Sequence, residues 1–180
     1  MHVHFQKKKF KNNIPVVLGL LSIWYNNFFN AESESVIPYS EYLSKLVPYL
    51  QQAVMESNGK EVDRNGNTVD YQTGTIVWGS TGTNAQHAFF QLIHQGTKLI
   101  PADFICFAKS LHGAQEHQDI LLANCFAQTE SLMDGTLGKE VPTAFRNFAG
   151  NKPTTTIIIN KLTPASLGSL IALYEHKLFV

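Results

Sequence analysis

The sequence has little of what marks a secreted, membrane-spanning or nucleic-acid-binding protein. Its 180 residues include only two cysteines, Cys106 and Cys125, whose spacing matches no disulfide framework, so we expect two reduced thiols. Fourteen basic and fourteen acidic side chains give a formal net charge of zero, which provides no positive field for nucleic acid or a membrane surface. The longest apolar stretch, residues 14–25, is too short to cross a bilayer, and no small-residue cleavage site follows it. These absences predict a soluble, cytoplasmic, globular protein.

The usual local signatures of catalytic and metal sites are also missing. Residues 63–67 resemble the start of a calcium loop, but Gly66 stands fourth rather than sixth, so a hairpin turn is the better interpretation. The Gly-Ser-Thr-Gly stretch at residues 79–82 is too short for a phosphate-binding loop. His112 and His117 lack the spacing of a helical zinc pair, and no Gly-x-Ser-x-Gly nucleophile turn occurs.

Hydrophobic residues make up 44% of the chain, which is enough for an ordinary buried core. Short β-branched or apolar runs typical of buried strands alternate with stretches whose apolar residues recur at helical spacing. The expected strands are residues 36–39, 75–78, 98–105 and 154–159, and the expected helices are residues 14–24, 42–55, 84–93, 118–133 and 163–178. This alternation predicts an α/β fold in which helices cover a mainly parallel sheet.

Several local features refine the expected helices. The first helix is apolar on nearly all sides, so we expect it to be buried. Pro48 stands inside the second helix and would kink it, and the Asn-Gly pair at residues 58–59 would end that helix. Asn84 would cap the third helix. The last helix carries His176 and Lys177 where they suit its negative end.

Two stretches are much more specific than these features. The first runs Met-Glu-Ser-Asn-Gly-Lys at residues 55–60 and continues to Val-Asp-Tyr-Gln-Thr-Gly at residues 69–74. The second runs Ile-Val-Trp-Gly at residues 76–79 and Gly-Thr-Asn-Ala-Gln-His-Ala-Phe at residues 82–89. In this order they resemble the second half of the glucose-6-phosphate isomerase (phosphoglucose isomerase) family, and both ends of the chain resemble it too.

The resemblance implies a fold and a domain. Residues 14–180 would form the family's second sugar isomerase domain, a flavodoxin-like three-layer α/β/α sandwich truncated at its C-terminal side, after a leading segment of residues 1–13. Residues 178–180 are apolar and follow a helix directly, where a further strand is expected, so we expect a piece of a longer protein. The family forms homodimers with shared active sites, so a second copy is the implied protein partner.

The resemblance also implies an activity. The family interconverts glucose 6-phosphate and fructose 6-phosphate in glycolysis and gluconeogenesis, without a metal or organic cofactor. This aldose–ketose isomerisation, an intramolecular oxidation–reduction, opens the sugar ring and moves a proton between C2 and C1 through an enediol. In this sequence the catalytic base would be Glu56, and the ring-opening histidine, contributed across the subunit interface, would be His87. A substrate-contacting glutamine would be Gln52.

The expected helices give these residues a physical basis. Glu56 would stand at the end of its helix, where the negative end of the dipole disfavours a carboxylate and so strengthens a base. Gln52 lies one turn earlier and would share its face. His87 would lie in the first turn of the helix capped by Asn84, near a positive end that allows proton exchange with the sugar. Without the resemblance, Glu56 is better interpreted as a solvated helix-end acid and His87 as an ordinary helical residue.

The sequence also departs from the family. Ser80 stands where the family has glutamate, Ala85 stands where it has glycine, and residues 134–149 form a shortened connection. The family's phosphate-binding loop, its active-site arginine and its active-site lysine lie outside these 180 residues. The alternative function is therefore a truncated, catalytically inactive module that binds sugar phosphate or dimerises.

Overall fold

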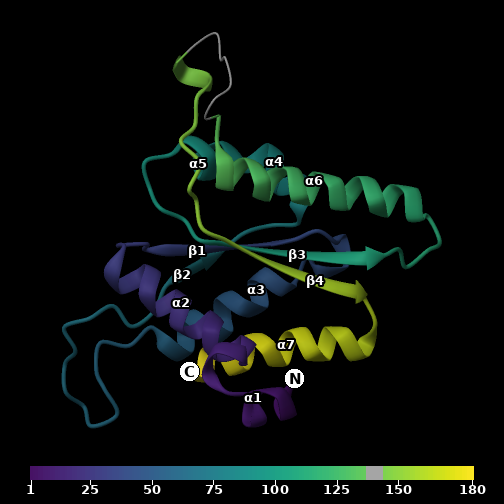
Figure 1. The fold of residues 1–180 in the computed structure, drawn as a ribbon. Helices are drawn as coiled ribbons and strands as arrows, with labels where there is room; N and C mark the ends of the chain where they lie inside the picture. Colours follow the sequence, from purple (N-terminus) through teal and green to yellow (C-terminus); the bar gives the residue numbers. More distant parts are fainter. Residues whose placement is uncertain (137–143) are drawn as a thin grey trace.

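The computed structural model describes residues 1–136 and 144–180, which are built around a four-stranded sheet (Figure 1). The strands are β1 (Ser33–Pro38), β2 (Ile76–Trp78), β3 (Ala102–Lys109) and β4 (Thr154–Lys161), in the spatial order β2-β1-β3-β4. All three pairings are parallel, which confirms the predicted α/β fold. The third strand begins later than expected, at Ala102, so Pro101 stays outside the ladder, where its missing N–H breaks no strand hydrogen bond.

Helices cover both faces of the sheet and complete three layers (Figure 1). One face is covered by α4 (Gly82–Ala88), α5 (Phe90–Gln95) and α6 (Gln115–Asp134), and the other by α2 (Ile14–Phe28), α3 (Leu46–Gln51) and α7 (Pro164–Phe179). The three-layer α/β/α sandwich implied by the resemblance is thus confirmed. Among the described residues, no helix has both the length and the apolar character needed to cross a bilayer.

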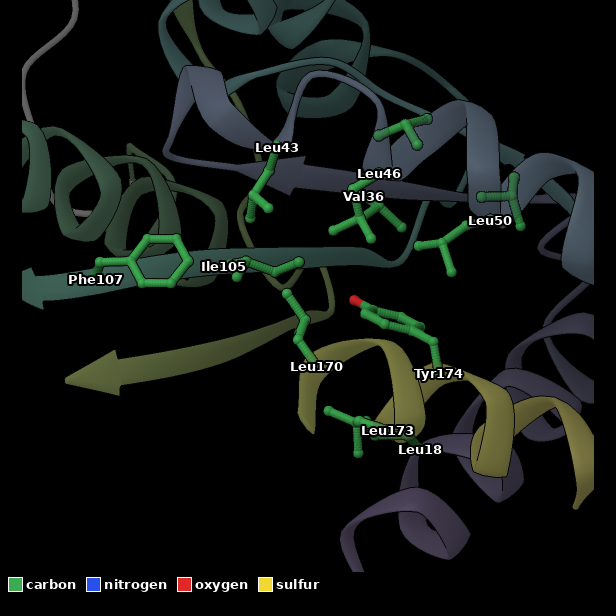
Figure 2. Packing of buried hydrophobic residues seen from close by; sticks show 12 residues of the cluster. Leu18, Val36, Leu43, Leu46, Leu50, Ile105, Phe107, Leu170, Leu173 and Tyr174 are labelled. Atoms are coloured by element: carbon green, nitrogen blue, oxygen red, sulfur yellow. The ribbon is translucent and has the colours of Figure 1, made fainter. Parts of the chain in front are cut away.

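Each face of the sheet has its own hydrophobic core, because successive strand residues point to opposite sides. Val36 of β1 and Ile105 of β3 pack with Leu170 of α7 in the first core (Figure 2). Their sequence neighbours Ile37 and Phe104 belong to the second core, under α5 and α6. Both sides of the sheet are therefore occupied, as a parallel sheet requires.

Two helices differ from the expectation. The first, α2, is not buried on all sides: Leu18 is buried, but Trp24 is 52% exposed and Phe28 is 69% exposed. This helix packs along α7, and its opposite side faces solvent. The second, α3, begins at Leu46, so Pro48 lies in its first turn, where proline is tolerated, rather than in its interior.

The leading segment of residues 1–13 is helical and attached to the last helix. It contains α1 (His2–Lys7) and a short turn at Phe10–Asn12. The ring of Phe5 stacks on that of His176 in α7, with 4.3 Å between ring centroids. At the other irregular region, the shortened connection predicted at residues 134–149 falls largely on residues 137–143, outside the described part of the chain.

The structure brings the two cysteines together, which the sequence analysis did not expect. Cys106 of β3 and Cys125 of α6 are fully buried in the second core, where their sulfur atoms lie in direct contact. The two residues are 19 positions apart, a spacing that matches no motif. Their pairing depends on how α6 packs on β3, which the spacing alone could not reveal.

Candidate active site

Gln52 and Glu56, two of the three predicted site residues, lie together at the end of one helix. After α3 the backbone continues into a π-helical turn over residues 52–56. Gln52 Nε2 donates a 3.4 Å hydrogen bond to Glu56 Oε2, and both side chains are exposed. The preceding residue, Gln51, ties the helix to the sheet, because its Nε2 donates to the carbonyl of Val77 in β2 at 3.0 Å. The shared face of Gln52 and Glu56 is confirmed.

The helix end is closed by Gly59 and Lys60. The N–H of Gly59 donates to the carbonyl of Met55 at 3.0 Å, and a Cβ added to Gly59 would lie only 2.3 Å from that oxygen. Glycine is therefore needed for this close approach. Lys60 Nζ donates to the carbonyls of Glu56, at 2.7 Å, and Ser57, at 2.9 Å. The predicted end of the helix is confirmed.

The segment after the helix is a hairpin turn, as predicted, and not a calcium loop. Val62 and Thr68 form an antiparallel bridge, and Gly66 takes a φ of 83° at the turn. The Asp63 carboxylate accepts hydrogen bonds from the side chain and backbone of Asn67, and these bonds lower the pKa of Asp63. Within the described ranges, no three metal-binding side chains form a cluster.

The helix that carries His87 starts earlier than predicted. The N-cap of α4 is Thr81, not Asn84, so His87 lies in the last turn of a seven-residue helix instead of its first. The helix-dipole argument for His87 therefore had the wrong sign. Tertiary packing explains the shift: Gly82 lies against the ring of Tyr39, where an added Cβ would come within 2.6 Å. His87 itself is exposed.

Glu56 and His87 belong to opposite layers of the sandwich. Glu56 follows α3, in the layer of α2 and α7, whereas His87 lies in α4, in the layer of α5 and α6 (Figure 1). The structure therefore does not bring the predicted base and the predicted ring-opening histidine together within one chain. Of the two departures near His87, Ala85 is fully buried in the second core and Ser80 is half-buried after β2.

A buried charged cluster, which the sequence analysis missed, joins α7 to the sheet. Lys177, expected only to complement the end of its helix, forms ion pairs with Glu34 of β1 and, at 3.7 Å, with Asp103 of β3. The hydroxyl of Tyr174 donates to Asp103 at 3.0 Å, and that of Ser22 donates to Glu34 at 2.8 Å. The only sequence signal for this cluster was Asp103, an acidic residue within the apolar run that became β3.

Burial and the neighbouring charges have opposite effects on the pKa values in this cluster. Burial raises the pKa of Asp103 to about 6, against the opposing effect of the Lys177 ammonium. Burial also disfavours ionised Glu34, but the adjacent ammonium outweighs it and lowers the pKa of that carboxyl. Burial by itself would lower the pKa of Lys177, yet the two carboxylates raise it. At neutral pH one ammonium therefore lies between two carboxylates.

A cavity of about 680 Å³ adjoins the end of the helix that carries Glu56. It lies between α2, the C-terminal end of α7 and the hairpin loop, and its wall includes Asn58, Lys60, Arg64 and Lys177. Gln52 and Glu56 are not part of this wall. The cavity therefore reaches the end of the helix without including the predicted base.

Comparison with known proteins assigns this geometry to a family. The family model described as phosphoglucose isomerase matches residues 1–180. The chain belongs to the phosphoglucose isomerase family. A glucose-6-phosphate isomerase of Christiangramia forsetii is 62% identical over 196 aligned residues, which cover the whole chain and 36% of that relative. The corresponding protein of Chlorobium luteolum is 54% identical with the same coverage.

Solved structures agree with this membership. The crystal structure of a glucose-6-phosphate isomerase from Chlamydia trachomatis matches with a TM-score of 0.89 and 37% identity, over 98% of this chain and 35% of that chain. A hypothetical protein from Thermus thermophilus, 20% identical with a TM-score of 0.69 over 96% of this chain and 40% of its own, shares the fold. The chain spans only about a third of the length of the relatives it matches.

Proposed function

We propose that the full-length protein containing this chain is a glucose-6-phosphate isomerase, which interconverts glucose 6-phosphate and fructose 6-phosphate in the cytoplasm. The observation that carries the proposal is the contact between Gln52 and Glu56, in a chain that belongs to this family. It supplies an exposed carboxylate whose position is held by a neighbouring amide. Residues 14–180 would then be most of the second sugar isomerase domain, truncated at its C-terminal side.

In this proposal Glu56 moves a proton between C2 and C1 of the open-chain sugar. The amide of Gln52 donates to Oε2, which leaves Oε1 to accept the proton. No cation of the described residues forms an ion pair with the Glu56 carboxylate. The carboxylate is therefore accessible and is not engaged by a positive partner, as a general base requires.

We assign the opening of the sugar ring to His87, acting across the interface of a homodimer. The support is its exposed position in the layer opposite Glu56. With this separation, the Glu56 and His87 of one chain would serve different active sites, and each site would be completed by the second copy.

A second candidate is a truncated module that binds sugar phosphate or dimerises without catalysis. It is favoured by one observation: the chain covers 36% of the length of a relative that it matches. The phosphate loop, arginine and lysine that the family uses fall outside residues 1–180. This candidate applies if the protein in the cell consists of these residues alone.

The decisive experiment is Glu56→Gln in the full-length protein. We expect the exchange of the sugar C2 proton with deuterated solvent to fall on the order of 10³-fold or more, with the fold intact. Glu61→Gln changes an exposed acid on the loop that follows this helix; it is the matched control and should leave exchange unchanged. Exchange retained in Glu56→Gln would show that another residue is the base.

A further inference from the structure

The side chain of Lys60 folds back onto the helix end that carries Glu56. Its Nζ lies 2.7 Å from the carbonyl oxygen of Glu56 and 2.9 Å from that of Ser57. These carbonyls belong to the last turn of the helix, where no following helical N–H can donate to them. The ammonium satisfies both carbonyls and places a positive charge at the negative end of the helix.

Lys60 is itself held in place by the hairpin loop. Its N–H donates to the carbonyl of Asn58 at 2.8 Å, and its own carbonyl accepts a 2.7 Å hydrogen bond from Thr73 Oγ1. The loop returns so closely that a Cβ added to Gly74 would lie 3.2 Å from the carbonyl of Asn58. Both backbone polar groups of Lys60 are thus hydrogen-bonded. Its Cα is therefore held in a fixed position, from which the side chain reaches the carbonyls of Glu56 and Ser57.

A lysine near an acid can either pair with its carboxylate or bind the backbone next to it, and the contacts of Lys60 show the second arrangement. An ammonium paired with the Glu56 carboxylate would compete with the proton that a base must accept. In the described residues the ammonium instead contacts the backbone carbonyl of Glu56, while the carboxylate contacts Gln52. The charge is near the base but leaves Oε1 of its carboxylate open.

We infer that Lys60 is a positioning residue for the base: its ammonium holds the carbonyls of Glu56 and Ser57, which fixes the backbone of Glu56 and keeps its carboxylate beside Gln52. This inference rests on the proposed role of Glu56. It adds a residue outside Gln52, Glu56 and His87 to the machinery of the reaction.

The test compares Lys60→Met and Lys60→Arg in the full-length protein. For Lys60→Met we expect kcat to fall roughly tenfold with KM changed less than about threefold, because the base is misplaced while the sugar still binds. Lys60→Arg, which keeps the charge and the donors, should restore kcat to within about threefold of the parent.

Lys45→Met is the matched control, since Lys45 is exposed at the opposite end of the same helix. It should leave both kcat and KM unchanged. If Lys60→Met does not fold, Lys60→Gln replaces it in the comparison with Lys60→Arg. A kcat of Lys60→Met within twofold of the parent, a KM that rises as much as kcat falls, or a loss that Lys60→Arg does not restore, would overturn the inference. Glu56→Gln measured alongside keeps the two proposals apart: exchange retained there refutes the assigned base, whereas its loss with a normal Lys60→Met refutes only the role of Lys60.

Discussion

Replacing Lys177 with methionine tests how the buried charged cluster holds α7 on the sheet. Methionine keeps much of the apolar stem but removes the ammonium, so Glu34 and Asp103 remain buried beside each other without a counter-charge. Removing one partner of a buried ion pair costs about 3–5 kcal/mol. Because the cluster joins α7 to β1 and β3, we expect the free energy of opening of these three elements to fall by that amount at pH 8.

The loss should be smaller in acid. The pKa of Asp103 is about 6 in the intact cluster, because burial raises it, and removing Lys177 takes away the main charge that opposes this rise. At pH 5 the Asp103 carboxyl is therefore protonated in the variant, and one of the two uncompensated charges disappears. A loss of opening free energy that is smaller at pH 5 than at pH 8 indicates buried carboxylates without a counter-charge, because lost packing would not depend on pH.

Amide hydrogen exchange of the full-length protein, read by mass spectrometry on peptides from β1, β3 and α7, measures these opening free energies. Lys98→Met is the matched control, because Lys98 and its partner Glu32 are 67% and 71% exposed and their ion pair is worth about 0–1 kcal/mol. Adding Glu34→Gln and Asp103→Asn to Lys177→Met should recover much of the loss. A loss equal at both pH values, or no larger than that of the control, would refute the reasoning.

Three further outcomes are expected. The pKa of Asp103 is raised to about 6, above its ordinary value of 3.8, so its contribution to stability is present below about pH 4 and is lost as the pH rises through 6. In urea unfolding, Asp103→Asn should remove this decline in the free energy of unfolding. His87→Ala should harm turnover of cyclic sugar phosphate more than that of an open-chain analogue, while His94→Gln, whose Nε2 contacts Gln128, should be milder; equal losses on both substrates would indicate a structural role for His87. Residues 1–180 alone should show no turnover of fructose 6-phosphate in an assay coupled to glucose-6-phosphate dehydrogenase, since positioning and electrostatic groups outside the chain are missing; turnover abolished by Glu56→Gln would contradict this.

Features set by neighbouring residues could be predicted from the sequence. The last helix opens with Thr163, whose hydroxyl accepts from the N–H of Ser166 in a capping box, within three residues. The helix before Gly59 ends where glycine permits the close approach to Met55. The contact between Gln52 and Glu56 followed from helical spacing alone.

Features set by packing between distant segments could not be predicted in the same way. The start of α4 depends on the Tyr39 ring against Gly82, which are more than forty residues apart, so Asn84 was a reasonable but wrong cap. Lys177 had two local possibilities, solvent or the helix end, and its buried position is set by acids on β1 and β3. In each case a contact across the fold overrode a sound local preference.

The separation of Glu56 and His87 allows a direct test of the proposed shared site. If each site takes Glu56 from one subunit and His87 from the other, Glu56→Gln and His87→Ala homodimers should both be impaired. A mixed dimer, however, would contain one site with both defects and one with neither. One of the two sites of each mixed dimer is intact, so the purified mixed dimer should recover about half of the parent activity. The two full-length variants would be co-expressed with different affinity tags, the mixed dimer purified through both, and turnover compared with that of each homodimer. If both residues acted within one chain, every site of the mixed dimer would be defective, and the absence of recovery would refute the shared site.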